Sequence, residues 1–255
     1  MSFSLNPNLD VGRLAAEFQQ KRRLRIENIL RPEDAEAILD ALANYTAWHL
    51  VYSDDNGRPV RLDNAQLEQV SEQELQAKVG ELQRRAASSY QFMYKFYPII
   101  DAIHEGKLTE NSRLYDVATF VNSAEFIKFA RQLTDTDSLV KMDPQASLYE
   151  AGHFLNVHDD VGDKRESPDG SVRRFAVVFG FTKNWSANWG GQTNFFSGVG
   201  DLSCEGLFPG FNCMTVFEVP VLHSVGHVSP FATKGRYSVT GWLRDDESIS
   251  RTDIE

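Results

Sequence analysis

The pattern of hydrophobic and polar positions changes character about half-way along this chain of 255 residues. In the first part, apolar residues recur every three to four positions, as they do on one face of an amphipathic helix. Helices are therefore expected over 8–21, 32–44, most of 64–103 and 123–133. The alternating stretch 24–30 predicts a strand, and the polar segment 51–63, with its Asp-Asn-Gly turn signal, predicts a turn or hairpin.

From about residue 137 the apolar runs become short and are separated by Gly, Asp and Asn. A succession of such runs predicts the strands of a sandwich or barrel. The expected strands are 139–142, 146–157, 174–182, 193–196, 214–219, 223–228 and 236–242. No linker-like segment marks the change. We therefore expect an α+β protein of one domain, 1–255, in which a mainly helical support region, 1–136, precedes a β core, 137–246.

The composition fits a globular chain and argues against several classes of partner. Hydrophobic residues make up 42% and aromatic residues 11% of the sequence, enough for a sizeable core. The net charge of −10 disfavours nucleic-acid binding, because phosphate contacts need a clustered basic face. The sequence has no apolar run of transmembrane length, no leader-like N-terminal pattern and only two cysteines. These features predict a cytoplasmic protein without a membrane or nucleic-acid partner.

The candidate chemistry lies in the β-rich part, where His158 is followed two positions later by Asp160. If residues 154–160 are extended, both side chains project from the same face of one strand end. An imidazole and a carboxylate so placed can occupy adjacent positions on one metal ion. A second imidazole would complete a facial triad with open positions, as in non-haem Fe(II) oxygenases. The pair alone also fits a polar turn at a strand end.

Further candidates follow near the C-terminus. His223 and His227 have the same strand parity, so either could supply the second imidazole. Arg236 opens a strand-like run, and its planar fork suits a dicarboxylate cosubstrate better than a lysine would. Ser238 shares the face of Arg236 by strand period and could add a hydroxyl to that carboxylate. Considered without the other residues, Arg236 would also be consistent with a solvent-exposed arginine on an edge strand.

Taken in order, these elements resemble a known family. The segments that carry the resemblance are YEAGHFLNVHDD (149–160), RR (173–174) before an apolar strand, WGGQ (189–192), HSV (223–225) and RYSVTGW (236–242). Together they are similar to the prolyl 4-hydroxylase-like branch of the 2-oxoglutarate- and Fe(II)-dependent dioxygenases. The similarity covers about 138–244, and the segment 25–44 resembles the usual lead-in of that family. It implies a double-stranded β-helix, a jelly-roll core, with iron at its open mouth.

The resemblance also implies roles for individual residues. His158, Asp160 and His223 match the iron ligands, and Arg236 matches the residue that pairs with the distal carboxylate of 2-oxoglutarate. Tyr149 resembles a tyrosine that lines the cosubstrate pocket. The implied cofactors are Fe(II), 2-oxoglutarate as cosubstrate, and O₂.

Four further features complete the comparison with the family. Some relatives carry a tyrosine that touches 2-oxoglutarate near Phe179 or Gly180, and here that contact is missing. His227 lies nine residues before Arg236, a spacing also seen in relatives, although His223 fits the motif better. Gly190 and Gly191 resemble a tight turn before a core strand and receive a structural role only. His153 is five residues before His158, which turns it to the other face of the strand.

The expected activity is hydroxylation of a substrate C–H bond with release of succinate and CO₂. A prolyl residue of a protein or peptide is the expected substrate, and a small molecule such as a free amino acid is the alternative. Two other classes stay open: a metal-binding β-barrel that acts as a sensor or scaffold, and an interaction module without a metal. The first leaves Arg236 without a role, and both predict no succinate formation.

Overall fold

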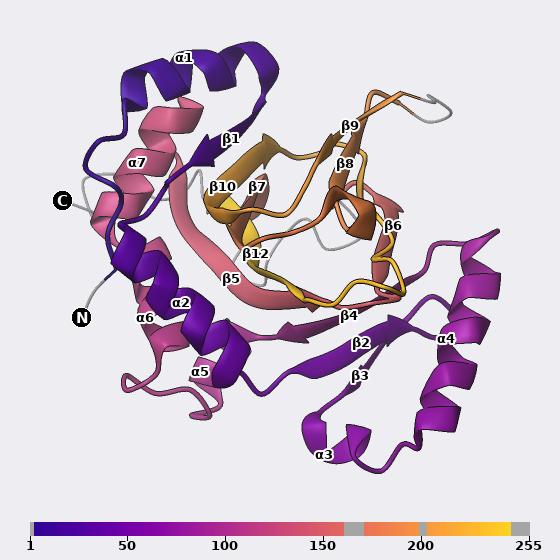
Figure 1. Cartoon of the computed structure of the whole chain (residues 1–255). Coiled ribbons are helices and arrows are strands. Elements are labelled where there is room, and N and C mark those ends of the chain that lie inside the picture. Colours follow the sequence, from indigo (N-terminus) through magenta and orange to yellow (C-terminus); the bar gives the residue numbers. More distant parts are fainter. Residues whose placement is uncertain (1–2, 161–170, 199–202, 246–255) are drawn as a thin grey trace.

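The protein is described from a computed structural model that covers residues 3–160, 171–198 and 203–245. Its centre is one strongly curled antiparallel sheet, which wraps into a half-barrel (Figure 1). Several helices pack on the outside of this sheet, so the expected α+β, jelly-roll-like fold is confirmed. None of the described helices is both long enough and apolar enough to cross a membrane.

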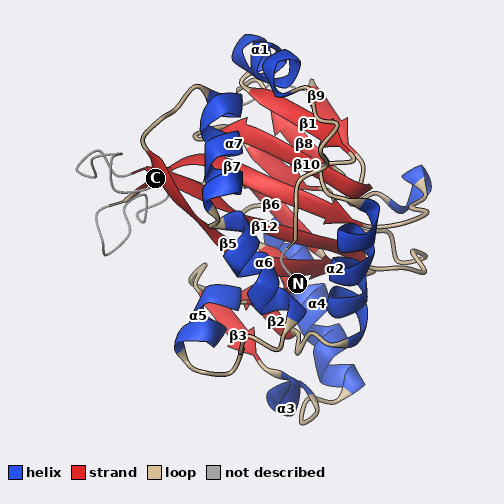
Figure 2. Ribbon diagram, turned by 90° about the vertical axis from the view of Figure 1, so that its left-hand side faces the viewer, coloured by secondary structure: helices blue, strands red, loops and turns tan. Residues whose placement is uncertain are grey.

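The helices of the N-terminal part cover the outer face of the sheet (Figure 2). They are α1 (Val11–Lys21), α2 (Pro32–Asn44), α5 (Ile99–His104), α6 (Arg113–Val121) and α7 (Ala124–Thr134). Local signals define their ends. Pro32 opens α2 at its first turn, and the Ser123 side chain caps α7 by accepting a hydrogen bond from the Phe126 amide. Their apolar faces pack with the sheet in one large hydrophobic core.

The sheet runs in the order β1-β10-β7-β12-β5-β4-β6-β11-β8-β9, and β2 and β3 extend from β4. The strands are β1 (Arg23–Glu27), β2 (His49–Ser53), β3 (Pro59–Leu62), β4 (Phe92–Tyr97), β5 (Leu139–Tyr149), β6 (Phe154–His158), β7 (Val172–Phe181), β8 (Thr193–Phe196), β9 (Cys204–Leu207), β10 (Phe211–Glu218), β11 (His223–Val225) and β12 (Arg236–Asp245). Because the sheet curls, β12, β5 and β4 face β11 and β8 across one interior, and β6, which pairs with both β4 and β11, joins the two sides (Figure 1).

Most expected elements of the first part form as the pattern predicts. The helices expected at 8–21, 32–44 and 123–133 are α1, α2 and α7, the strand at 24–30 is β1, and 51–63 contains the β2–β3 hairpin. The expectation of one or two helices over most of 64–103 is only partly correct. This segment holds α3 (Asn64–Leu67), α4 (Glu72–Ala86) and α5, but also the strand β4. β4 has buried side chains on both faces, because α4 packs against one face and the other faces the interior of the half-barrel, so its apolar positions do not alternate.

The β core also departs from the expected boundaries. The strand expected over 146–157 is divided, and its first part joins the run 139–142 in one strand, β5, which continues through Pro144. This is possible because Pro144 pairs with β12 on one side, whereas on the other side β4 reaches only Ala146 to Leu148. β6 is separate, and β9 was not expected at all. The expected end of the core at 246 lies outside the described residues.

Candidate active site

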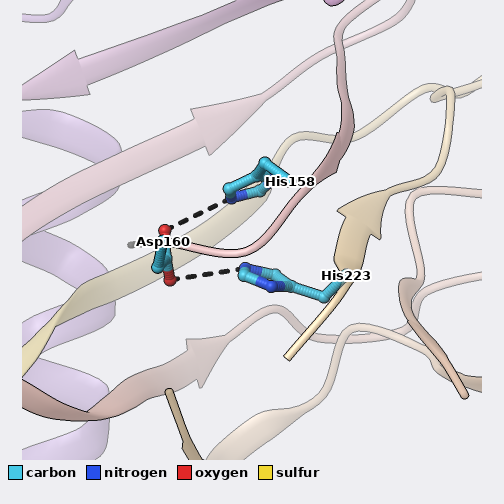
Figure 3. Close-up of side chains that lie close together, drawn as sticks. All are labelled: His158, Asp160 and His223. Atoms are coloured by element: carbon cyan, nitrogen blue, oxygen red, sulfur yellow. Dashed lines mark ion pairs between the residues drawn. The ribbon is translucent and has the colours of Figure 1, made fainter. Parts of the chain in front are cut away.

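Three side chains that could hold a metal ion meet inside the mouth of the half-barrel (Figure 3). His158 ends β6 and His223 begins β11, and the two residues are register partners with ring centroids 4.1 Å apart. Asp160 follows β6 and lies between them. Its Oδ1 is 3.4 Å from Nε2 of His158, and its Oδ2 is 3.5 Å from Nε2 of His223. Sequence reasoning therefore named the residues that the fold brings together.

The geometry that brings Asp160 to the cluster differs from the expected one. β6 ends at His158, so Asp160 is not on the same face of a continuing strand. Instead its backbone is left-handed, with φ of 62°, a conformation that aspartate adopts more readily than most residues. The chain turns at this point, and the carboxylate comes back toward both imidazoles.

Both imidazoles are oriented by their own strands. Nδ1 of His158 lies 2.9 Å from the carbonyl oxygen of Asn156, and Nδ1 of His223 lies 2.9 Å from that of Val221. A carbonyl only accepts, so each Nδ1 carries the proton, and in the neutral ring each Nε2 keeps the lone pair that a metal ion would bind. The candidate ligand atoms lie within 4.8 Å of one another, and cis ligands of one ion lie about 3 Å apart. The three residues therefore fit a divalent metal with open positions.

The charges in this cluster favour an ionised carboxylate. Burial by itself would raise the pKa of Asp160, but the nearby imidazoles of His158 and His223 outweigh it and lower that pKa overall. Burial would lower the pKa of His158, yet its contact with Asp160 raises it overall. The pKa of His223 is lowered by burial and by the neighbouring His158. A carboxylate and one readily neutral imidazole suit metal ligation.

His227 does not join this cluster. The strand expected over 223–228 ends at Val225, so the parity argument that grouped His227 with His223 does not apply. The His227 ring is exposed and stacks on Phe154, with centroids 5.6 Å apart and planes 14° from parallel. His153 is also elsewhere: it is buried, and its Nδ1 accepts a hydrogen bond from the Glu150 amide.

A cavity of about 270 Å³ extends from the three candidate ligands into the half-barrel, and it reaches Tyr149 and Arg236. Arg236 is only 5% exposed, and its Nη2 donates to Oγ1 of Thr193 at 2.9 Å. Its guanidinium carbon lies 5.1 Å from the centre of the Tyr149 ring. Burial lowers the pKa of Arg236 from its very high ordinary value, but a guanidinium keeps its proton at neutral pH, so Arg236 stays charged.

The lining of the cavity is asymmetric in charge. Within the described residues it includes one carboxylate, Asp160, and two guanidinium groups, Arg173 and Arg236. Arg173 stacks at 3.7 Å over Trp242 and donates to the backbone oxygen of Asp160 at 3.3 Å. Once Asp160 binds a metal ion, the lining is positive and suits an anionic ligand.

Ser238 lies behind this cavity. It faces inward on the same side of β12 as Arg236, as the strand period predicts, and it is buried. Its hydroxyl lies 3.0 Å from that of Ser147 on β5. It lines a smaller adjoining space that it shares with Arg236, Gly180 and Cys213.

The absence of a tyrosine near Phe179 and Gly180 has a steric cause. Phe179 points to the outer face, where it packs against Phe126 of α7. Position 180 faces inward, but a Cβ there would lie 2.7 Å from Sγ of Cys213 and 2.7 Å from the carbonyl oxygen of Gly210. No side chain fits at 180 without moving the backbone.

Sequence reasoning missed the aromatic residues that β4 and its preceding turn contribute. Tyr90, Phe92 and Tyr94 line the cavity, and Tyr94 stacks on Tyr149 with centroids 4.9 Å apart and planes 12° from parallel. Burial raises the pKa of Tyr94 to about 12, so its hydroxyl stays protonated. The alternation Tyr90-Gln-Phe92-Met-Tyr94 was the available signal, since aromatic residues at every second position are typical of a strand.

Residues 144–244 match the family model described as the 2OG-Fe(II) oxygenase superfamily. This part of the chain is similar to members of that superfamily. It contains the three candidate ligands, Tyr149 and Arg236, so the resemblance seen in the sequence is confirmed. Members of the superfamily use Fe(II), 2-oxoglutarate and O₂. The comparison with curated proteins finds no match.

Solved structures of 2OG-Fe(II) oxygenases share the fold. A prolyl-4-hydroxylase from Pseudomonas putida is 15% identical, with a TM-score of 0.52 over 92% of this chain and 99% of that one. A prolyl hydroxylase from Trichoplax adhaerens, in complex with a hypoxia inducible factor peptide fragment, is 13% identical, with a TM-score of 0.59 over 92% and 89%. The epimerase SnoN from nogalamycin biosynthesis is 12% identical, with a TM-score of 0.54 over 92% and 82%.

Within the superfamily match, the Gly190–Gly191 turn before β8 has the expected structural role. Both residues have positive φ, 66° and 67°. A Cβ at 190 would lie 2.3 Å from the carbonyl oxygen of His227, so the turn requires glycine there.

Proposed function

We propose that this chain is a 2-oxoglutarate- and Fe(II)-dependent dioxygenase in which His158, Asp160 and His223 bind the iron. Arg236 binds the far carboxylate of 2-oxoglutarate, with Tyr149 beside it. One observation carries this proposal: a buried guanidinium and a cluster of two imidazoles and one carboxylate share one cavity. Burying a charged guanidinium costs free energy unless a partner binds it, and a sensor or scaffold that only binds a metal offers no such partner in this cavity.

The side chains have separate tasks in this proposal. Iron bound at the cluster would activate O₂ for attack on a C–H bond, at the expense of 2-oxoglutarate. Arg236 offers donors other than the one bonded to Thr193, and these orient the cosubstrate. Ser238 holds Ser147 in place behind this contact. Apolar residues such as Phe217 and Val225 line the walls and exclude water from the reacting centre.

A prolyl residue in a protein or peptide is the substrate that we propose first. An open groove of about 670 Å³ adjoins the cavity, and the two share Tyr90, Leu155 and Val225. A peptide whose reacting residue enters the cavity needs such space for its flanking residues. Two of the proteins with the same fold are prolyl hydroxylases by name.

A small molecule such as a free amino acid is the second candidate. The observation in its favour is Arg173, a guanidinium at the mouth beside Asp160, which could pair with the carboxylate of a free amino acid. SnoN, which shares the fold, belongs to the biosynthesis of a small molecule.

One experiment tests the activity before any substrate is known. Fe(II) and 2-oxoglutarate are added to the protein without oxygen, binding is measured, and succinate is quantified after exposure to air. Succinate formation supports the dioxygenase, metal binding without succinate supports the sensor, and no metal binding leaves only an interaction module. Mass spectrometry for +16 on proline in candidate peptides, set against free amino acids, then separates the two substrate classes.

A further inference from the structure

Tyr94 continues a row of side chains that begins at Arg236. Tyr149 on β5 is the register partner of Arg236 on β12. On the other side of β5, Lys95 of β4 pairs with Leu148, which places Tyr94 next to Tyr149. The two tyrosine rings are stacked and nearly parallel, and all three side chains line the cavity. Three adjacent strands therefore present one guanidinium and two phenols in a line.

This row points toward the candidate metal ligands. The strands lie in the order β12, β5, β4, β6, and β6 carries His158. From Tyr94 the row of ring contacts continues along β4 through Phe92 to Tyr90, whose ring lies 6.2 Å from that of His158. Along this row Tyr94 lies between Tyr149 and the candidate ligands, on the side of Tyr149 that faces the metal-binding end of a bound ligand.

The hydroxyl of Tyr94 is available for a ligand. Of the residues that the structure describes, none forms a hydrogen bond with it, and none forms one with the hydroxyl of Tyr149. A buried phenol normally finds an acceptor, and the cavity that both tyrosines line is where an acceptor could bind.

We propose that Tyr94 is a 2-oxoglutarate-binding residue, whose hydroxyl donates a hydrogen bond to the oxygen atoms at the metal-binding end of the cosubstrate. This inference rests on the proposed function, since it presumes that 2-oxoglutarate occupies the cavity. It assigns to β4, outside the matched segment 144–244, a contact with the cosubstrate.

The test compares two keto acids without oxygen on the Fe(II)-loaded protein. 2-Oxoglutarate has a distal carboxylate for Arg236, whereas 2-oxobutyrate has the same metal-binding end but no distal carboxylate. The readouts are the dissociation constant and the visible charge-transfer absorption of the Fe(II)–keto acid complex. The variants are Tyr94→Phe and Tyr97→Phe. Tyr97 is a matched control on the same strand, because it packs in the main hydrophobic core and does not line the cavity.

If Tyr94 donates to the metal-binding end, Tyr94→Phe weakens both keto acids by about tenfold and shifts the absorption maximum. Tyr97→Phe leaves both readouts unchanged. Unaltered affinity and absorption in Tyr94→Phe would overturn the inference. A loss confined to 2-oxoglutarate would also overturn it, because Tyr94 would then act only by packing against Tyr149 and Arg236. If the unaltered protein binds neither keto acid, the proposed function itself fails, which is a distinct result.

Discussion

The guanidinium of Arg236 lies over the ring of Tyr149, its register partner on the neighbouring strand, at 5.1 Å. Both side chains are almost fully buried, yet they come from opposite ends of the matched segment. A cation over an aromatic face is favourable when both are removed from water. The ring thereby fixes the direction of the guanidinium, and the donors not used by Thr193 are left for a ligand.

Replacement of Arg236 should weaken 2-oxoglutarate binding in graded steps. Arg236→Lys keeps the charge but loses the planar fork, so we expect affinity to fall by about tenfold. Arg236→Gln removes the charge as well, and we expect about a hundredfold loss. The dissociation constant measured by calorimetry checks this. Arg22→Gln, which removes an arginine on the outer surface, is the control and should bind normally. Equal affinity in all four proteins would remove Arg236 from this role.

Measurements of Fe(II) affinity should distinguish the three candidate ligands from the histidines outside the cluster. His158→Ala, Asp160→Ala and His223→Ala are each expected to reduce Fe(II) affinity and uncoupled succinate release by more than about a hundredfold. His227→Ala should retain Fe(II), because that ring stacks on Phe154 outside the cluster. Equilibrium dialysis followed by metal analysis provides the measurement.

The exposed His104 at the end of α5 offers a control for the loss of any imidazole. His104→Ala should match the unaltered protein in both readouts. Near-normal turnover in any one of the three ligand variants would contradict the assigned site, and loss of Fe(II) in His227→Ala would reopen the choice of the second imidazole.

The sequence predicted this site well where the signal was local. His158 and Asp160 are two residues apart, and Arg236 opens a strand with strict period-2 patterning, so short motifs sufficed to find them. The helices α2 and α7 were equally accessible, because Pro32 and Ser123 mark where they begin.

What the sequence did not reveal depends on contacts between distant segments. β4 follows a helix-forming segment and has buried residues on both faces, so its apolar positions do not alternate, and the aromatic alternation up to Tyr94 was overlooked. The left-handed backbone of Asp160 is a property of a turn that local parity cannot describe. The need for glycine at 180 arises from Gly210 and Cys213, two residues on another part of the sheet. Such proximity exists only in the folded chain.

The steric argument at Gly180 can be measured as stability. Gly180→Ala would place a methyl group against backbone oxygen as well as the Cys213 thiol, and overpacking of this kind costs about 1–3 kcal/mol. Gly80→Ala, in the middle of α4 with open space around it, should instead stabilise by about 0.5–1 kcal/mol. The free energies of unfolding of both variants, measured in urea, should therefore change in opposite directions relative to the unaltered protein. Equal stability of Gly180→Ala and the unaltered protein would show that the backbone yields there at little cost.

The buried His153 should make stability depend on pH. Burial lowers its pKa from 6.5 to about 4, and the charges of Lys95 and His227 add to this effect while Glu150 opposes it. The unfolded chain therefore binds a proton near pH 6.5, whereas the folded chain does so only near pH 4. The free energy of unfolding is therefore highest above pH 6.5. It decreases as the pH falls toward 4, by on the order of 1–3 kcal/mol.

His153→Asn isolates this contribution, because an asparagine oxygen can still accept the hydrogen bond from the Glu150 amide but does not titrate. Free energies of unfolding in urea, measured on the metal-free protein at intervals from pH 7 to pH 4.5, should fall less steeply for the variant than for the unaltered protein. His104→Asn, at an exposed position, should follow the unaltered protein across the range. If the curves for His153→Asn and the unaltered protein run parallel, His153 is not the group whose protonation destabilises the fold.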